Sequence, residues 1–191
     1  MRANRGELLG VYQQALAECD ARRLVQRHLT GSAPDRPVEV VAIGKAAAAM
    51  YEGLAECSPI RRAFLVLPKG VEVPPGVEAV HGDHPLPGPA SFEAGRRLLR
   101  YLESLHGPVV ALLSGGASAL CEVPRPPLGA EEVAARHRAL LASGASITEV
   151  NAERRALSLL KGGGLARLLG RRLLRSLVLV DVPSGDAHVV G

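Results

Sequence analysis

An apolar run that ends abruptly at a glycine turn is the feature of this sequence that most restricts its fold. The run covers residues 109–113, and Ser114-Gly115-Gly116-Ala117-Ser118 follows it at once. A short, uninterrupted apolar run is typical of a buried parallel strand, and glycine lets the backbone turn tightly and approach a ligand. The free N–H groups of a helix after such a turn favour negative charge. The segment therefore predicts a strand that enters a helix through an anion-binding turn; a turn without a ligand is the alternative.

Strand and helix patterns alternate along the chain. Short apolar runs predict strands at 38–43, 63–67, 77–80, 109–113 and 177–182. Helical spacing predicts helices at about 5–28, 46–57, 130–142, 147–160 and 165–174, and a further helix that Ser91 caps. This alternation predicts an α/β fold of the doubly wound, Rossmann-like class, with a mostly parallel sheet and helices on both faces.

Composition favours one globular domain that binds a small molecule. The 191 residues are 47% hydrophobic, which is enough to build a core. The net charge is +4, but the chain has only three Tyr, two Phe and no Trp to stack on bases, so nucleic acid is not an expected partner.

The sequence shows no candidate membrane span, signal peptide or disulfide pattern. No apolar run reaches the roughly 18 residues of a membrane span, and the N-terminus leads into a helical pattern instead of a signal peptide. Cys19, Cys57 and Cys121 are odd in number and far apart, which favours buried free thiols over disulfides or a metal site. We therefore expect a cytoplasmic protein with no membrane partner.

Polar residues are expected to gather at the carboxyl ends of three strands. These residues are Gly44-Lys45, the 114–118 turn, and the segment that contains Asp181 and Asp186. Ligands of doubly wound sheets lie at that edge. Lysine can neutralise phosphoryl charge, hydroxyls and glycine N–H groups suit phosphate oxygens, and aspartates suit Mg²⁺ or the proton of a hydroxyl. For the two aspartates, ordinary turn chemistry is the alternative.

Lysine is rare in this chain, and its positions are unusual. Lys45, Lys69 and Lys161 are its only lysines among 23 basic residues, and each is adjacent to a glycine. A compact ammonium group beside a tight turn is a frequent way to hold phosphate.

Familiar short motifs are missing or incomplete. Neither a P-loop nor a Gly-x-Gly-x-x-Gly follows a strand, and Leu120 stands where a Gly-x-Ser-x-Gly hydrolase turn would end in glycine. His81 and His84 have a spacing that suggests metal binding, but no carboxylate or cysteine cluster accompanies them, so a solvated or capping role is favoured.

Taken together and in order, the segments resemble the N-terminal domain of the glycerate 2-kinase family, which pairs with a MOFRL domain and is often labelled hydroxypyruvate reductase. The resemblance covers nearly the whole chain. It is carried by Ala42-Ile43-Gly44-Lys45-Ala46-Ala47, Gly82-Asp83-His84-Pro85-Leu86-Pro87, Ser91 with Glu93-Ala94-Gly95-Arg96, Leu113-Ser114-Gly115-Gly116-Ala117-Ser118-Ala119-Leu120, Leu141-Ala142-Ser143-Gly144-Ala145-Ser146-Ile147 with Glu149 and Asn151, Leu157-Ser158 with Lys161-Gly162-Gly163, and Asp181-Val182-Pro183.

The resemblance implies ATP- and Mg²⁺-dependent phosphorylation of D-glycerate at its 2-hydroxyl, in a cleft between two domains. It assigns catalysis to Lys45 and Asp186 and metal binding to Asp181 and Asp186. It assigns substrate and phosphate binding to Ser114, Gly115, Gly116, Ser118, Asn151, Arg154 and Lys161.

The chain also departs from the family pattern. Ala117 stands in place of a third glycine, Glu153-Arg154-Arg155-Ala156 in place of a Val-Arg-Lys-His-like run, and Gly185-Asp186 in place of paired aspartates. The expectation for domains is that 1–191 is a truncated N-terminal-type domain without its MOFRL-type domain, so that a complementing C-terminal chain or a homodimer completes it. Two alternatives stay open: a sugar-phosphate isomerase or lactonase, and a non-catalytic subunit that needs a second chain.

Overall fold

The computed structural model describes residues 4–180, apart from the side chains of residues 147 and 148, and contains one parallel sheet. Its strands are β1 (Val38–Ile43), β2 (Ile60–Pro68), β3 (Glu78–Gly82), β4 (Val109–Leu113) and β5 (Leu173–Val178). They lie in the order β3-β2-β1-β4-β5, and every neighbouring pair is parallel. The predicted fold class is therefore confirmed.

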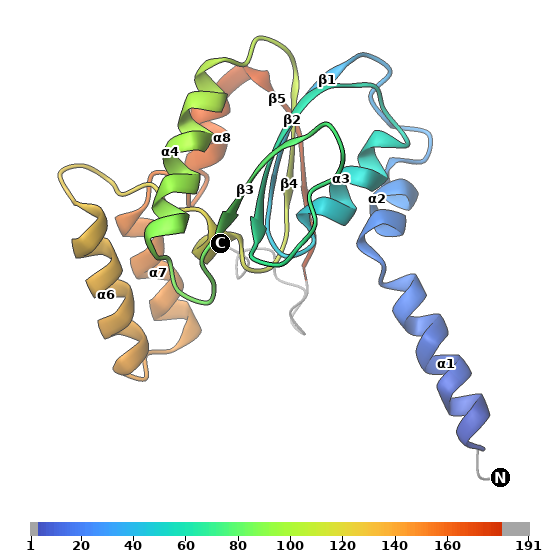
Figure 1. Ribbon diagram of the computed structural model, residues 1–191, viewed down its shortest axis with the longest axis horizontal. Coiled ribbons are helices and arrows are strands. Elements are labelled where there is room, and N and C mark those ends of the chain that lie inside the picture. The colour runs from blue at the N-terminus through green and yellow to red at the C-terminus, as the bar shows by residue number, and fades with distance from the viewer. Residues whose placement is uncertain (1–3, 181–191) are drawn as a thin grey trace.

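Helices cover both faces of this sheet (Figure 1). On one face lie α2 (Ala21–Leu29) and α3 (Ala47–Ala55), and on the other lie α4 (Pro89–Glu103) and α8 (Gly164–Leu169). Successive strand residues point to opposite faces, so Val40 packs in the core with α2 and α3, whereas Val41 packs in the core with α4 and α8. The central strand β1 is buried along its whole length because both of its faces are covered.

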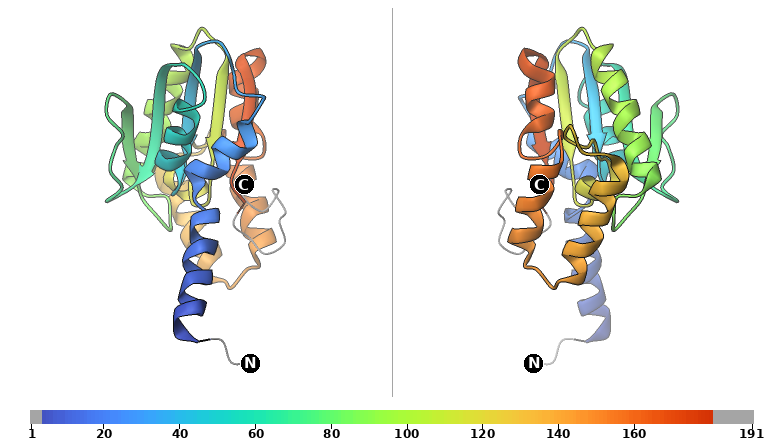
Figure 2. Two further views of the ribbon diagram at one scale, coloured as in Figure 1. Left: turned by 90° about the vertical axis from the view of Figure 1, so that its right-hand side faces the viewer. Right: turned by 90° about the vertical axis from the view of Figure 1, so that its left-hand side faces the viewer.

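A helical hairpin extends from one end of the sheet. It consists of α6 (Ala130–Ala142) and α7 (Ile147–Leu157), which lie side by side in both views of Figure 2. Val133 of α6 and Leu157 of α7 pack with Phe92 of α4 in a small separate core. The short α5 (Ala117–Leu120) and the 3₁₀ turn Gly170–Arg172 complete the described elements.

The predicted single helix at 5–28 was wrong. The structure has α1 (Arg5–Glu18) and α2, separated at Asp20, whose carboxylate accepts the N–H of Arg23 at 2.9 Å and so caps α2. Helix α1 buries no residue and projects from the body of the molecule (Figure 1), so apolar residues such as Leu8 and Tyr12 stay exposed. Helical spacing alone did not reveal the break.

Several other element boundaries shift. Helix α4 begins at Pro89 after an N-cap at Gly88, so Ser91 is not the N-cap residue but caps the helix from its first turn, where its hydroxyl accepts the N–H of Gly88 at 3.4 Å. Strand β5 begins at Leu173, before the predicted start at 177, and ends at Val178, while the predicted residues 181 and 182 lie outside the described residues. The prediction missed the start because β5 is an edge strand whose exposed positions, such as Leu174, interrupt the apolar pattern. The expectation of buried thiols holds for Cys121 but is wrong for Cys19, which is exposed. None of the described helices is long and apolar enough to cross a membrane.

Candidate functional site

The loops that follow β1 and β4 meet at the carboxyl edge of the sheet. The N–H of Lys45 donates to the carbonyl oxygen of Gly115 at 2.9 Å, and the N–H of Ala46 donates to Oγ of Ser114 at 3.1 Å. The chain leaves β1 toward β2 and leaves β4 toward β5, so this edge is the topological switch point where doubly wound folds bind ligands. Two of the three loops expected to converge therefore do so.

Two glycines make this close approach feasible. Gly44 has φ +135°, and a Cβ there would overlap Oγ of Ser114. Gly116 has φ +87°, and a Cβ there would lie 3.2 Å from Cγ of Lys45 and 3.3 Å from Cδ2 of His84. Both conformations are ones that other residues rarely adopt. The side chains of Lys45 and His84 consequently lie against the backbone of the glycine loop, which we define as residues 114–116.

The glycine loop offers hydrogen-bond donors that the described protein does not use. Within residues 4–180, the N–H groups of Gly115 and Gly116 donate to no hydrogen bond, and the exposed Lys45 makes no ion pair. The helix that follows has only four residues, so its dipole contributes little. The sequence predicted that a helix N-terminus would attract an anion. In the structure, the N–H groups of the glycine loop and the ammonium group of Lys45 are better placed to do so than the short helix. Ser118 lies within α5 and is half-buried.

His84 is a site residue that sequence reasoning missed. Burial lowers the pKa of its imidazole below the ordinary value of 6.5, and the positive charges of Lys45 and Arg154 lower it further. Its segment directly follows β3, and this position after a strand is the signal that could have placed it at the same edge as Lys45.

Arg154 connects this edge to the helical hairpin. It lies on α7, and burial lowers the pKa of its guanidinium while Glu122 opposes that change. Its Nε is buried without a hydrogen bond in the described part of the chain. Asn151, one turn earlier on α7, is also buried, with 7% of its surface exposed. The structure thus brings Arg154 into the electrostatic neighbourhood of His84.

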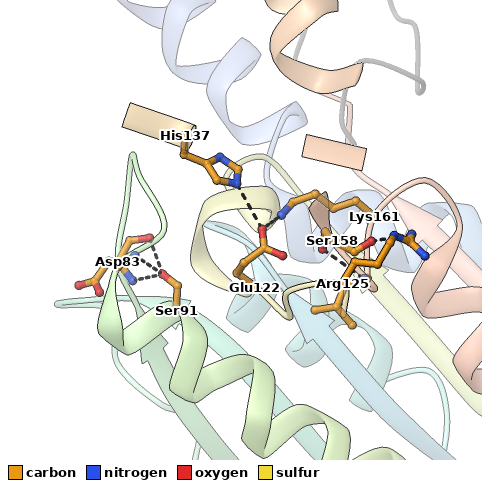
Figure 3. Close-up of polar contacts among 9 residues, drawn as sticks. Asp83, Ser91, Glu122, Arg125, His137, Ser158 and Lys161 are labelled. Atoms are coloured by element: carbon orange, nitrogen blue, oxygen red, sulfur yellow. Dashed lines mark hydrogen bonds and ion pairs between the residues drawn. The ribbon is translucent and has the colours of Figure 1, made fainter. Parts of the chain in front are cut away.

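Lys161 lies in a different setting, a buried cluster with Glu122 and His137 (Figure 3). Its ammonium group forms an ion pair with Glu122, and Nε2 of His137 lies 3.7 Å from the same carboxylate oxygen. Burial lowers the pKa of Lys161, although Glu122 opposes the change. Burial also lowers the pKa of His137 to about 4. Sequence reasoning missed Glu122 and His137, because nothing near them in the chain marks them as partners of Lys161.

Lys69 is likewise occupied by a carboxylate. Its Nζ lies 2.7 Å from Oδ1 of Asp83, and the other oxygen of Asp83 accepts the N–H of Ala90 at 2.9 Å. The hydrogen bond from Lys69 lowers the pKa of Asp83. Ser91 holds the same turn, because its hydroxyl accepts the N–H of Asp83 at 2.9 Å (Figure 3). Lys45 therefore differs from the other two lysines in having no acidic partner among the described residues.

The predicted metal ligands Asp181 and Asp186 lie outside the described residues. Across residues 4–180, no group of three or more His, Cys, Asp or Glu side chains is arranged to hold a metal ion.

Comparisons with known proteins agree with this geometry. A family model described as "Domain of unknown function (DUF4147)" matches residues 7–191. The chain is 35% identical over 190 residues to a D-glycerate 2-kinase of Thermotoga maritima and 35% identical over 154 residues to a glycerate 2-kinase of Sulfurisphaera tokodaii. A crystal structure of a glycerate kinase from Thermotoga maritima superimposes with a TM-score of 0.82 at 33% identity and covers 96% of this chain.

These matches cover only part of each relative. The two sequence alignments cover 89% and 80% of this chain but 45% and 38% of the relatives, and the structural match covers 45% of the solved chain. The chain thus spans less than half the length of these relatives.

Proposed function

Because the chain belongs to the DUF4147 family, we propose that it forms the N-terminal part of a kinase that phosphorylates D-glycerate at its 2-hydroxyl with ATP. The observation that carries this proposal is the contact between Lys45 and the glycine loop at the switch point of the sheet. Among residues 4–180, the ammonium group of Lys45 has no acidic partner and the N–H groups of Gly115 and Gly116 donate to no hydrogen bond, so these groups can bind an anion. A carboxylate and a phosphoryl group both carry the negative oxygens that such a site binds. A glycerate kinase reaction, which the names of the relatives favour, involves both groups.

Each site residue has a role in this proposal. Lys45 neutralises charge on the transferred phosphoryl group, which is spread over its oxygens in the transition state. The glycine loop and Ser118 bind the same anion through N–H and hydroxyl groups. Arg154 and Asn151 line the cleft from α7. Lys161, whose charge is already paired with Glu122, supports the site from the buried cluster and does not bind the anion itself.

Magnesium and the second domain also belong to the proposal. Mg²⁺ would be held by Asp181 and Asp186 and would neutralise phosphate charge when bound. A MOFRL-type second domain would close the cleft, since phosphoryl transfer needs donor and acceptor fixed in a dry site. We propose a cytoplasmic location and assembly as a homodimer or with a partner chain.

The test is an assay of ADP and 2-phosphoglycerate formation from ATP, Mg²⁺ and D-glycerate, by this chain alone and with a co-expressed C-terminal domain. Full turnover is expected only with the second domain, and Lys45→Ala should lower kcat by on the order of a hundredfold, the scale of one preorganised electrostatic group. Lys69→Ala is the matched control, because that lysine is paired with Asp83. Absence of product in every combination, or equal rates for Lys45→Ala and wild type, would contradict the proposal.

A further inference from the structure

The imidazole of His84 lies against the glycine loop, on the same backbone that Lys45 contacts. A Cβ at Gly116 would approach Cδ2 of His84 to 3.3 Å and Cε of Lys45 to 3.3 Å. His84 follows β3 and Lys45 follows β1, so the parallel sheet brings together two side chains that are 39 positions apart in the sequence. A ligand held by Lys45 and the loop N–H groups therefore lies within reach of this ring.

The nitrogens of His84 are available to such a ligand. The neighbouring His81 is already engaged, because its Nε2 lies 3.0 Å from the carbonyl oxygen of Val71. Within the described ranges no hydrogen bond involves the ring of His84, and the residue is exposed. The two histidines thus differ among the described residues: the ring of His81 contacts the carbonyl oxygen of Val71, whereas the ring of His84 makes no hydrogen bond and can contact a ligand.

The charges around His84 favour its neutral form. Lys45 approaches from the loop after β1, and Arg154 acts on it from α7. The adjacent carboxylate of Asp83 is occupied by Lys69 and by the N–H of Ala90. Two cations and partial burial lower the pKa of the imidazole below 6.5, so one ring nitrogen is an unprotonated acceptor at neutral pH. The same cations attract an anionic substrate.

We propose, on the basis of the proposed function, that His84 is a catalytic residue that accepts the proton of the hydroxyl group being phosphorylated. The transferred phosphoryl group lies on Lys45 and the loop N–H groups. The carboxylate of a 2-hydroxy acid binds to Arg154, which places the hydroxyl on the neighbouring carbon beside the ring of His84. The O–H bond breaks and its proton moves to the unprotonated ring nitrogen of His84. The oxygen forms a bond to the γ-phosphorus of a nucleoside triphosphate. The bond from that phosphorus to the bridging oxygen breaks, its electron pair leaves with the nucleoside diphosphate, and the imidazolium later releases its proton to water.

The first test uses nuclear magnetic resonance and needs no turnover. The Cε1–H signals of the six histidines are recorded across pH with and without D-glycerate, and His84→Gln identifies the signal of His84. We expect D-glycerate to raise the pKa of His84 and to shift its signal more than 3-hydroxypropanoate does, because that acid has the carboxylate but no 2-hydroxyl. His106, which is exposed before β4 at the opposite edge of the sheet, should not respond. Equal responses to both acids, or no response at His84, would overturn the proposed contact.

The second test measures phosphorylation of D-glycerate with the C-terminal domain present. His84→Gln should lower kcat by on the order of a hundredfold with little change in KM, as expected for loss of a general base, whereas His106→Gln should keep the wild-type rate. The wild-type kcat/KM should fall as pH is lowered through the pKa of His84, and this acid limb should vanish in His84→Gln. A wild-type rate and pH profile in His84→Gln would reject the role of His84 and leave the kinase assignment intact. If D-glycerate shifts the His84 signal but the wild-type protein forms no product, the kinase assignment fails instead.

Discussion

The glycine loop beside Lys45 and the buried cluster around Lys161 place the same chemical group in opposite surroundings. Each lysine is adjacent to a glycine in the sequence. Lys45 is exposed and has no acidic partner in the described structure, whereas Lys161 is 6% exposed and paired with a carboxylate that is fully buried. The difference indicates separate tasks, because an unpaired exposed cation can bind a ligand and a paired buried one contributes to the architecture.

This comparison predicts that mutations in the two regions affect different properties. Changes in the buried cluster should lower the free energy of unfolding. Changes in the glycine loop should lower anion binding and turnover while the stability stays nearly constant.

The largest effect is expected from Glu122→Ala. Loss of this carboxylate leaves the Lys161 ammonium buried without its partner, which typically costs about 3–5 kcal/mol and should appear in urea-induced unfolding. The double variant Glu122→Leu/Lys161→Met removes both charges and should recover most of this loss, since apolar replacement of a buried pair is often neutral. A Glu122→Ala protein as stable as wild type would contradict the distinction between the regions.

A pH dependence of similar size is expected from His137. Its pKa is about 4 in the folded protein against 6.5 for an ordinary histidine. The unfolded chain therefore binds a proton between these values that the folded chain does not, and the free energy of unfolding decreases as pH falls from 6.5 toward 4, by about 3 kcal/mol at most. Thermal unfolding at several pH values should show a shallower dependence in His137→Gln, but not in His106→Gln, where the residue is exposed.

A matched pair of glycine substitutions separates backbone strain from loss of the site. Gly116→Ala and Gly31→Ala both place a side chain at positive φ, +87° and +74°, and each should cost about 1–2 kcal/mol of stability. The Cβ at Gly116 meets Lys45 and His84, whereas the Cβ at Gly31 meets nothing within 4 Å. Calorimetric titration with inorganic phosphate should show affinity weakened by on the order of tenfold, or about 1.4 kcal/mol, in Gly116→Ala alone. Equal affinity in both variants would place the anion site elsewhere.

The smallest stability effect is expected from Lys45→Ala. Its ammonium group has no acidic partner in the part of the chain that is described, so the free energy of unfolding should change by no more than about 0.5 kcal/mol. Phosphate should nevertheless no longer raise the melting temperature of this variant. A marked loss of stability would mean that Lys45, like Lys161, is structural.

Strands and helices with a strong local signal were predicted well from the sequence. The predicted bounds of β1, β4 and α6 agree with the structure. The two strands are covered on both faces of the sheet and therefore form unbroken apolar runs, and clear polar turns mark the ends of these elements. The resemblance to glycerate 2-kinases is confirmed by relatives of that name and by the matching crystal structure. The roles of individual site residues, ATP, Mg²⁺ and the second domain stay predictions.

Elements with a weaker local signal were placed less well. The break between α1 and α2 depends on one capping residue, Asp20, within a continuous helical pattern. The edge strand β5 mixes exposed and buried positions, so its start could not be read from hydropathy. The place of His84 directly after β3 indicates the site better than its spacing to His81, which suggests only a metal site.

The sequence by itself determined the alternation of strands and helices, the glycine turns at the strand ends and the family resemblance, because these depend on residues close together in the chain. It did not determine which lysine is free. That depends on whether a carboxylate such as Glu122 lies within ion-pair distance of Lys161, 39 positions away. Only the tertiary structure decides such contacts, because packing of α6 and α7 with α4 and of α8 with the sheet sets both the distance between the charges and their exclusion from water.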